Sequence, residues 1–247
     1  MTENTRPAQP NMSLCHGIAC LQFLAMADRP IGSREAARAL GFEPTRANRL
    51  LGTLASLGIA EKTADQKYQA GPGLHVLAAQ SLRGSRLLNV ALPHLKPLLN
   101  QGLAVALGVL WRMHVCYLWY ILPDQDPGQG IGASNPWPAW DSSIGRVLLA
   151  ALPLSDARRL YLQEQAKPCK TCLEFKRNLN AIRRQGYAFI PKKAISGTTL
   201  GVPIGSPPVA GLAFCGNFSA RSVPRLFRLL NRSATDISQE LKSRRNS

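Results

Sequence analysis

Side chains that can read DNA bases gather on one side of a helix predicted over residues 44–57. Asn can form two hydrogen bonds to adenine, and Arg can bond guanine or a phosphate. Small residues beside them would let the helix lie close to the bases of a major groove. This face consists of Thr45, Asn48, Arg49, Gly52 and Ser56, flanked by Arg46 and Thr53. The chemistry expected is hydrogen bonding to base edges, although an ordinary exposed helix face would carry the same residue types.

The ends and the opposite side of this helix are also marked in the sequence. Pro44 suits a first helical position, where its missing N–H costs nothing, and Gly58 suits the end of the helix. The side opposite the polar face forms an apolar stripe that should pack on neighbouring helices. It consists of Ala47, Leu50, Leu51, Leu54 and Leu57.

Two shorter helices are expected before this one. The first is predicted to begin after Ser13 as N-cap and to end near Asp28. Its apolar stripe should consist of Leu14, Ile18, Leu21 and Ala25. The second is predicted over Ser33–Leu40, and Gly41 allows the tight turn that leads into the third helix.

Two short strands follow the third helix, over residues 59–63 and 68–70, joined by the polar turn 64–67. Such a hairpin directly after a helix that enters a groove commonly lies along the phosphate backbone, and Lys62 and Lys67 suit that contact. Three helices and a hairpin together indicate a winged helix-turn-helix over residues 12–72.

A second domain is predicted over residues 86–247, after a linker helix at 73–85. Pro93 and Pro97 should kink or divide its first helix. Helices and strands then alternate, which predicts an α/β sensory domain. The chain as a whole is expected to be α+β, with two domains. The helices are expected at 87–100, from 142, at 173–185 and at 223–244, the strands at 104–110, 115–121, 187–191, 200–204 and 209–216, and a long loop at 122–139.

Composition fits two globular domains, because 45% of the 247 residues are hydrophobic and only 18% are charged. Residues 1–11 are predicted to be a disordered arm, and the tail 242–247 should be similar. No apolar run is long enough for a membrane helix, and no secretory signal is seen. We therefore expect a soluble, cytoplasmic protein without a membrane partner, whose six cysteines stay thiols.

The formal charge of +16 suggests a polyanionic partner. Its distribution complicates that interpretation. Residues 1–71 hold 8 Lys and Arg against 6 Asp and Glu, a net of +2, whereas residues 72–247 hold 22 against 8, a net of +14. Most of the charge lies outside the predicted winged helix-turn-helix, either as a second nucleic-acid surface or, as we favour, as a solvated shell.

The sequence resembles the IclR family of bacterial transcription regulators. The likeness rests on 33–40, on 44–57 with its Asn-Arg-Leu-Leu run, on the wing ending at 68–71, and on 143–146, 182–187 and 210–213 in the second domain. Arg46 stands where many members have Thr or Ser, and Ala70 where Leu is usual. The resemblance implies a GAF-like effector-binding domain, partners that are double-stranded DNA and a small-molecule effector, a homodimer or tetramer, and no cofactor.

The resemblance also supplies candidate site residues. The DNA-contacting set would be Ser33, Arg34, Thr45, Arg46, Asn48, Arg49, Thr53 and Lys67. The effector-binding set would be Ser143, Ile144, Ile190, Leu200, Ala213 and Cys215. Because several of these positions are polar in acid-binding members and apolar here, we expect an apolar or aromatic ligand, with a carboxylate on the helix amides near Ser143.

The remaining reactive residues suggest other possible functions. Cys169 and Cys172 form a C-x-x-C pair that could be half of a zinc site or a redox pair, but a second such pair is absent. An enzyme could use Cys215 or Cys116 as nucleophile with His114 as base, yet no catalytic motif supports it. We expect no metal and no enzymatic activity. A ligand-sensing adaptor without DNA binding is the other alternative, disfavoured by the intact third helix.

Overall fold

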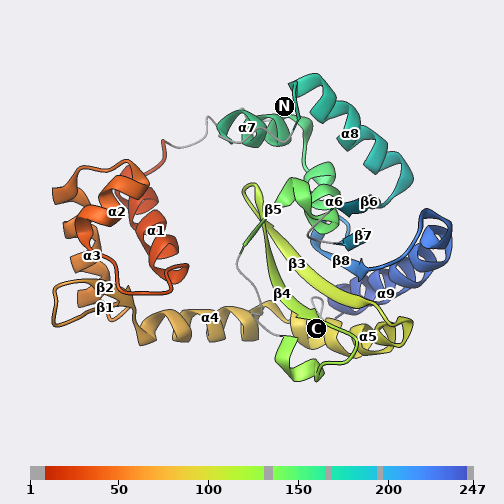
Figure 1. Ribbon diagram of the computed structural model, residues 1–247, viewed down its shortest axis with the longest axis horizontal. Helices are drawn as coiled ribbons and strands as arrows, with labels where there is room; N and C mark the ends of the chain where they lie inside the picture. Colours follow the sequence, from red (N-terminus) through yellow and green to blue (C-terminus); the bar gives the residue numbers. More distant parts are fainter. Residues whose placement is uncertain (1–8, 131–135, 165–168, 194–196, 244–247) are drawn as a thin grey trace. The chain divides into compact units, whose positions relative to one another are not determined.

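The computed structural model describes residues 9–130, 136–164, 169–193 and 197–243 (Figure 1). The chain divides into two compact units, Met1–Ser85 and Arg86–Ser247. The predicted arm and tail fall largely on residues 1–8 and 244–247, which lie outside the described residues. No helix among the described residues combines the length and the apolar character that crossing a membrane requires.

The first unit contains three helices, a hairpin and a fourth helix. Their bounds are α1 Met12–Ala25, α2 Ser33–Leu40, α3 Pro44–Ser56, β1 Ala60–Lys62, β2 Tyr68–Ala70 and α4 Pro72–Ser85. The strands pair antiparallel, with Ala60 opposite Ala70. On its other side β2 bonds to the segment before α2, because Ile31 and Tyr68 exchange both backbone hydrogen bonds at 2.8 Å. This pairing joins the wing to the segment between α1 and α2.

Local signals fix both ends of α3. Pro44 occupies its first turn, as the sequence predicts. At the other end, Gly58 takes the left-handed conformation with φ 68°. Its N–H bonds the carbonyl of Ala55 at 3.0 Å, and the N–H of Ile59 bonds that of Leu54 at 3.0 Å. These two bonds form a Schellman motif, which glycine favours because it has no Cβ.

The predicted buried face of α1 is wrong, although the helix itself is present. Its N-cap is Asn11, whose Oδ1 accepts from the Leu14 N–H at 3.1 Å, and not Ser13. Leu14 is 63% exposed, and the α1 residues that the unit buries fully are Cys20 and Leu24. The predicted stripe of α3 needs a similar correction, because Leu57 caps the helix and is 68% exposed.

α4 is the least buried helix of the first unit. None of its residues from 72 to 84 is buried, and Val76 and Leu77 are about half exposed. An isolated helix shorter than about 15 residues is marginal in water. Burial within its own unit therefore contributes little to the stability of α4.

The second unit is built on a wholly antiparallel sheet with strand order β5-β4-β3-β8-β7-β6. This arrangement makes the chain α+β, as predicted. Strand bounds are β3 Ala104–Trp111, β4 His114–Ile121, β5 Trp137–Pro138, β6 Ala188–Lys193, β7 Gly197–Gly205 and β8 Pro208–Gly216. Helix bounds are α5 Leu87–Leu95, η1 Lys96–Gln101, η2 Pro127–Gly130, η3 Ala139–Asp141, α6 Ser143–Ala151, α7 Leu154–Gln163, α8 Cys172–Gln185, η4 Ala220–Ser222 and α9 Val223–Ser243. Part of the predicted loop 122–139, residues 131–135, lies outside the described residues.

Helices pack against both faces of this sheet. α6 lies on the face where the strands carry small residues, and a Cβ at Gly211 would come within 2.8 Å of the Ile144 side chain. α9 packs on β7 and β8, and α5 packs on α9 (Figure 1). His94 of α5 lies 3.1 Å from Glu240 of α9, which joins those two helices. The predicted division of the helix 87–100 into two pieces is confirmed at Pro97, which lies in the first turn of η1, whereas Pro93 lies inside α5.

Candidate functional site

The polar face predicted on α3 is exposed. Thr45, Asn48, Arg49 and Thr53 lie in solvent, and Ala47 is fully buried on the opposite side. At about 100° per residue, the centre of the exposed face falls near Arg49 and the two margins fall at Arg46 and Asn48. Within 4 Å, a Cβ built at Gly52 would meet no atom. The face is therefore open to a close-fitting partner.

Asn48 lies on the margin of α3 that faces the wing. Its Oδ1 accepts a hydrogen bond from the Tyr68 hydroxyl at 3.3 Å. Tyr68 is itself nearly fully buried, in the core of the unit. A side-chain amide has further hydrogen-bonding capacity beyond one accepted bond, so the amide is oriented by the wing and can still bond a base edge.

Arg46 lies on the other margin, next to Leu50, which is the α3 residue that approaches Gly17 of α1. Arg46 and Arg49 are both exposed. Thr53 donates its hydroxyl to the Arg49 carbonyl at 2.9 Å. That bond leaves the Thr53 oxygen able only to accept from a partner.

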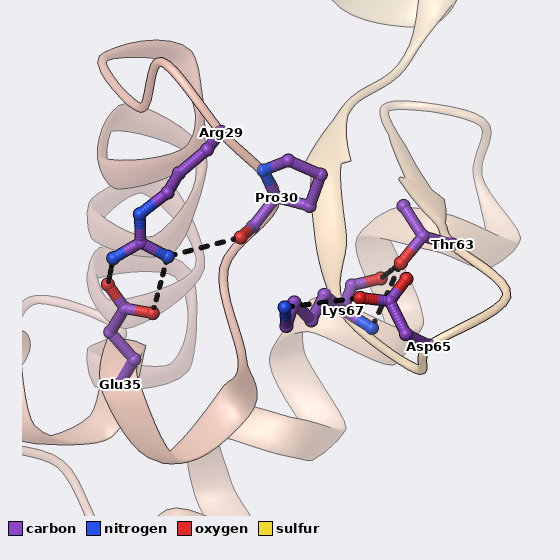
Figure 2. A network of polar contacts seen from close by, with 6 residues as sticks. All are labelled: Arg29, Pro30, Glu35, Thr63, Asp65 and Lys67. Atoms are coloured by element: carbon purple, nitrogen blue, oxygen red, sulfur yellow. Dashed lines mark hydrogen bonds and ion pairs between the residues drawn. The ribbon is translucent and has the colours of Figure 1, made fainter.

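The wing turn holds Lys67 in a small polar network (Figure 2). Its Nζ lies 3.1 Å from Oδ2 of Asp65, and its backbone N–H and carbonyl both bond Thr63 Oγ1 at 3.2 Å. The Lys67 ammonium, together with Thr63, lowers the pKa of the Asp65 carboxyl. Lys67 is therefore positioned at the wing tip, but its charge is partly compensated.

The start of α2 carries the two other predicted DNA contacts. Ser33 is half-buried and Arg34 is exposed. The loop before them is held by Arg29, whose guanidinium bonds both carboxylate oxygens of Glu35, at 2.6 and 3.2 Å (Figure 2). This hydrogen bonding lowers the pKa of Glu35. Because the pair is exposed, its contribution is mainly geometric.

In the second unit, strand register decides which predicted effector residues share a face. Cys215 pairs with Thr199, and Thr199 pairs with Ile190, so these three form one row across β8, β7 and β6. Ala213 lies two residues along β8 and points to the same side. The register does not bring Leu200 to this row: it pairs with Phe214 and Phe189 and is fully buried on the opposite face.

Thr199 is a polar residue of this row that the sequence did not reveal. Its hydroxyl oxygen is buried and, within the described part of the chain, has no hydrogen-bond partner. An unsatisfied buried hydroxyl costs roughly 1 to 3 kcal/mol and usually has an explanation in function. Thr199 was missed because Thr198 and Thr199 are adjacent and identical, and only the strand register decides which of them faces this row.

Two tyrosines of β4 add hydroxyls near this row. Tyr117 donates to Ser142 Oγ at 3.0 Å. The Tyr120 hydroxyl is hydrogen-bonded to the Cys215 thiol. Burial raises the pKa of Tyr120 to about 12 and also raises the pKa of the Cys215 thiol. The cluster is therefore neutral and can both donate and accept hydrogen bonds.

Replacing Tyr120 should change how the protein responds to alkali. Because the folded-state pKa of about 12 exceeds the roughly 10 of an unfolded tyrosine, the neutral phenol contributes stability that is complete below about pH 10. That stability is lost as pH rises towards about 12. Urea titrations across this range should show a free energy of unfolding that falls less steeply for Tyr120→Phe than for wild type. Equal slopes would contradict the assignment.

The start of α6 is closely packed and offers little space for an anion. Ser142 caps it by accepting from the Gly145 N–H at 3.3 Å. A Cβ at Gly201 would come within 2.9 Å of both the Ile144 nitrogen and the Ser143 hydroxyl oxygen. Ser143 and Ile144 are buried. The expected carboxylate site on these amides is therefore occupied by strand β7.

The cysteines considered for catalysis or metal binding lie in partly or fully buried surroundings. Burial raises the pKa of the Cys116 thiol as it does for Cys215, which disfavours the thiolate that a nucleophile needs. Cys169 is buried, and its sulfur accepts from Asn178 Nδ2 at 3.7 Å. Among the described residues, no three His, Cys, Asp or Glu side chains gather into a group that could hold a metal ion.

Part of the positive charge of the second unit lies along α9. Arg225, Arg228 and Arg232 recur at helical spacing and are exposed. Arg225 donates to Gln101 Oε1 at 2.6 Å. Because the charge surplus lies here and not on the winged unit, the DNA-binding interpretation depends on the geometry of α3 and the wing.

A winged helix-turn-helix unit followed by an antiparallel α+β unit defines the architecture of the chain. No family model matches the sequence, and no curated protein does. Solved structures match along nearly its whole length. A protein of Rhodococcus sp. RHA1 described as a transcriptional regulator is 25% identical, with a TM-score of 0.64, covering 94% of this chain and 98% of that one.

Two further structures carry a family name. An IclR family transcriptional regulator from Brucella abortus has 20% identity and a TM-score of 0.78, covering 97% of this chain and 96% of its own. An IclR homolog from Microbacterium hydrocarbonoxydans, complexed with 4-hydroxybenzoate, has 22% identity and a TM-score of 0.66, covering 94% and 99%. The chain has the fold of the IclR family of transcriptional regulators over nearly all of its length.

Proposed function

We propose that this protein is a ligand-responsive transcription regulator that binds operator DNA through its winged helix-turn-helix and senses a small molecule in its second unit. The observation that carries the proposal is the exposed polar face of α3, set beside a wing and built into a fold shared with IclR regulators. An enzymatic role is not proposed. Because its partner is DNA, we place the protein in the cytoplasm.

The DNA contacts proposed for the winged unit fall into two kinds. On α3, Thr45, Asn48 and Thr53 are suited to base edges, with Asn48 oriented by the wing. Arg46 and Arg49 can bond either a base or a phosphate. Lys67 on the wing, and Ser33 and Arg34 at the start of α2, are suited to phosphates. The full set is Ser33, Arg34, Thr45, Arg46, Asn48, Arg49, Thr53 and Lys67.

The effector site is proposed at the row formed by Ile190, Thr199 and Cys215, with Ala213 and Tyr120 beside it. Its hydroxyl and thiol groups suit the polar end of a small organic or aromatic acid, and its apolar side chains suit the ring or chain of that acid. The 4-hydroxybenzoate bound by the Microbacterium homolog is such a compound. Ser143 and Ile144 would support the site from behind, and Leu200 would not contact the ligand.

Thr199→Val should separate effector binding from folding. Removing an unsatisfied buried hydroxyl should raise the stability of the ligand-free protein by about 1 kcal/mol. The same change should lower the affinity for the effector by roughly tenfold, since the Thr199 hydroxyl is the proposed hydrogen-bond partner of the effector. Calorimetric titration with 4-hydroxybenzoate and other acids, beside thermal unfolding, measures both quantities.

The neighbouring residue provides a matched control. Thr198 is buried on the opposite face of β7 and pairs with Gly216. Thr198→Val should therefore leave ligand affinity unchanged. A Thr199 variant that binds every acid as tightly as wild type would exclude this hydroxyl from the effector site.

A dimer or a dimer of dimers is proposed, because pseudo-palindromic operators need paired winged units about one helical turn apart. Leu14 and Ile18 on α1, and Met26 directly after it, are exposed apolar side chains, and α4 has exposed Val76 and Leu77. Exposed apolar side chains in such numbers are typical of association surfaces.

The function is tested by footprinting purified protein on its own promoter region, with and without a panel of aromatic and aliphatic acids. We expect two protected half-sites and a change in protection with one class of acid. Absence of protection under all conditions would contradict DNA binding and favour a ligand-sensing adaptor.

A further inference from the structure

Two arginines of α3 line an open hollow that α1 borders on its other side. The hollow has a volume of ≈ 130 Å³, whereas a single water molecule needs roughly 10 to 15 Å³. It can therefore hold a tetrahedral oxyanion. Its lining consists of Met12, Ser13 and His16 from α1 and Arg46, Arg49 and Leu50 from α3.

Among the described residues, nothing compensates the positive charge in the hollow. The ion pairs among the described residues involve Arg29, Lys67, His94 and Arg159. Neither Arg46 nor Arg49 forms one with any described residue, and no carboxylate from the described part of the chain lines the hollow. Two neighbouring guanidinium groups repel each other, so an anion between them would be favoured, and guanidinium binds phosphate oxygens in a bidentate manner.

His16 supplies a further donor from the α1 side. Its ring lies 4.4 Å from that of Phe42, centroid to centroid, which holds the imidazole in place. An imidazole carries at least one N–H donor. The hollow thus brings together two planar cations and one positioned donor, a set suited to a phosphate.

The place of the hollow on α3 decides which phosphate it would take. Arg46 lies on the α1 margin of the exposed face and Arg49 near its centre, so the hollow borders the surface that enters the groove. We propose that it binds a backbone phosphate of the DNA strand that edges this groove. Arg46 and Arg49 then fix the position of α3 and do not read bases. This inference rests on the proposed DNA binding.

The test uses the salt dependence of binding, which counts phosphate contacts. Fluorescence anisotropy of the full chain would be measured on a mixed-sequence duplex and on the operator duplex over a salt series. Arg46→Gln and Arg49→Gln should each lower the slope of log K against log salt by about 0.9. Their preference for operator over mixed sequence should stay that of wild type. Arg83→Gln, which removes an exposed charge from α4, is the matched control and should leave the slope unchanged.

Inorganic phosphate and the His16 resonances distinguish DNA from a free anion. In wild type, phosphate should shift the His16 imidazole signals, and the mixed-sequence duplex should abolish that response. The Arg46→Gln and Arg49→Gln variants should show neither effect. A phosphate response with unchanged slopes would overturn the DNA assignment and make the hollow a site for a small anion.

The remaining outcomes separate the two proposals. A variant that loses operator preference while keeping its slope would mean that the arginine contacts a base, which overturns the inference. No response to phosphate and unchanged slopes would also overturn it. If wild type binds neither duplex, the proposed function fails, whatever His16 shows with inorganic phosphate.

Discussion

Gly145→Ala is expected to destabilise the second unit by more than about 3 kcal/mol. The Cβ added there would lie 2.1 Å from the Ala139 carbonyl oxygen and 2.5 Å from the Ala139 Cα. Both are backbone atoms, so no side-chain rotation can relieve the contact. Ala139 is fully buried and lies directly before the turn into α6. Overpacking of this kind usually costs about 1 to 3 kcal/mol of folding stability. Because the obstacle here is backbone, the cost of Gly145→Ala should lie at or beyond the upper end of this range.

Tryptophan fluorescence measures this effect in the second unit alone, because all four tryptophans lie after residue 86, at 111, 119, 137 and 140. The midpoint of thermal unfolding should fall by roughly 6 to 12 °C. Gly52→Ala is the matched control. Gly52 is also helical, but nothing lies within 4 Å of its added Cβ, so thermal unfolding of the first unit, followed by circular dichroism, should not be destabilised. An unchanged midpoint for Gly145→Ala would mean that α6 is not packed on Ala139 as described.

Helix periodicity predicted α1 but could not decide which side of it is buried. Leu14 and Ile18 form one apolar stripe, and Cys20 and Leu24 form another. A sequence shows both stripes equally, and only the packing partner selects between them. The signals around α3 were more decisive, because Pro44 and Gly58 have backbone preferences that act locally.

The same distinction separates the two candidate sites. The periodicity of a single helix is enough to separate the exposed side of α3 from its buried side. Thr45, Asn48 and Arg49 could therefore be placed on the exposed side from sequence. The effector row depends on strand pairing over long sequence separations, and a shift of one residue exchanges Thr199 with Leu200. Because Thr198 and Thr199 are adjacent and identical, the residue pattern of β7 does not show which of them faces the row.

Asn48→Ala is expected to weaken operator binding by about 1 to 3 kcal/mol, which is roughly 5- to 150-fold. The loss should appear on the operator and not on a mixed-sequence duplex, because a base contact is specific to its base. Asn48 is oriented by the 3.3 Å bond from Tyr68, whose ring is anchored in the core. Orientation before binding lowers the entropy cost of the contact.

Tyr68→Phe tests that orientation separately. It keeps the buried ring and removes only the hydroxyl, so the fold should persist while operator affinity falls by about 0.5 to 1.5 kcal/mol. The double variant should be no weaker than Asn48→Ala alone, because Tyr68 acts through Asn48. Anisotropy measurements on both duplexes decide the matter. If Asn48→Ala lowers affinity equally for operator and mixed sequence, Asn48 contacts the backbone, and base reading by α3 must come from Thr45 and its neighbours.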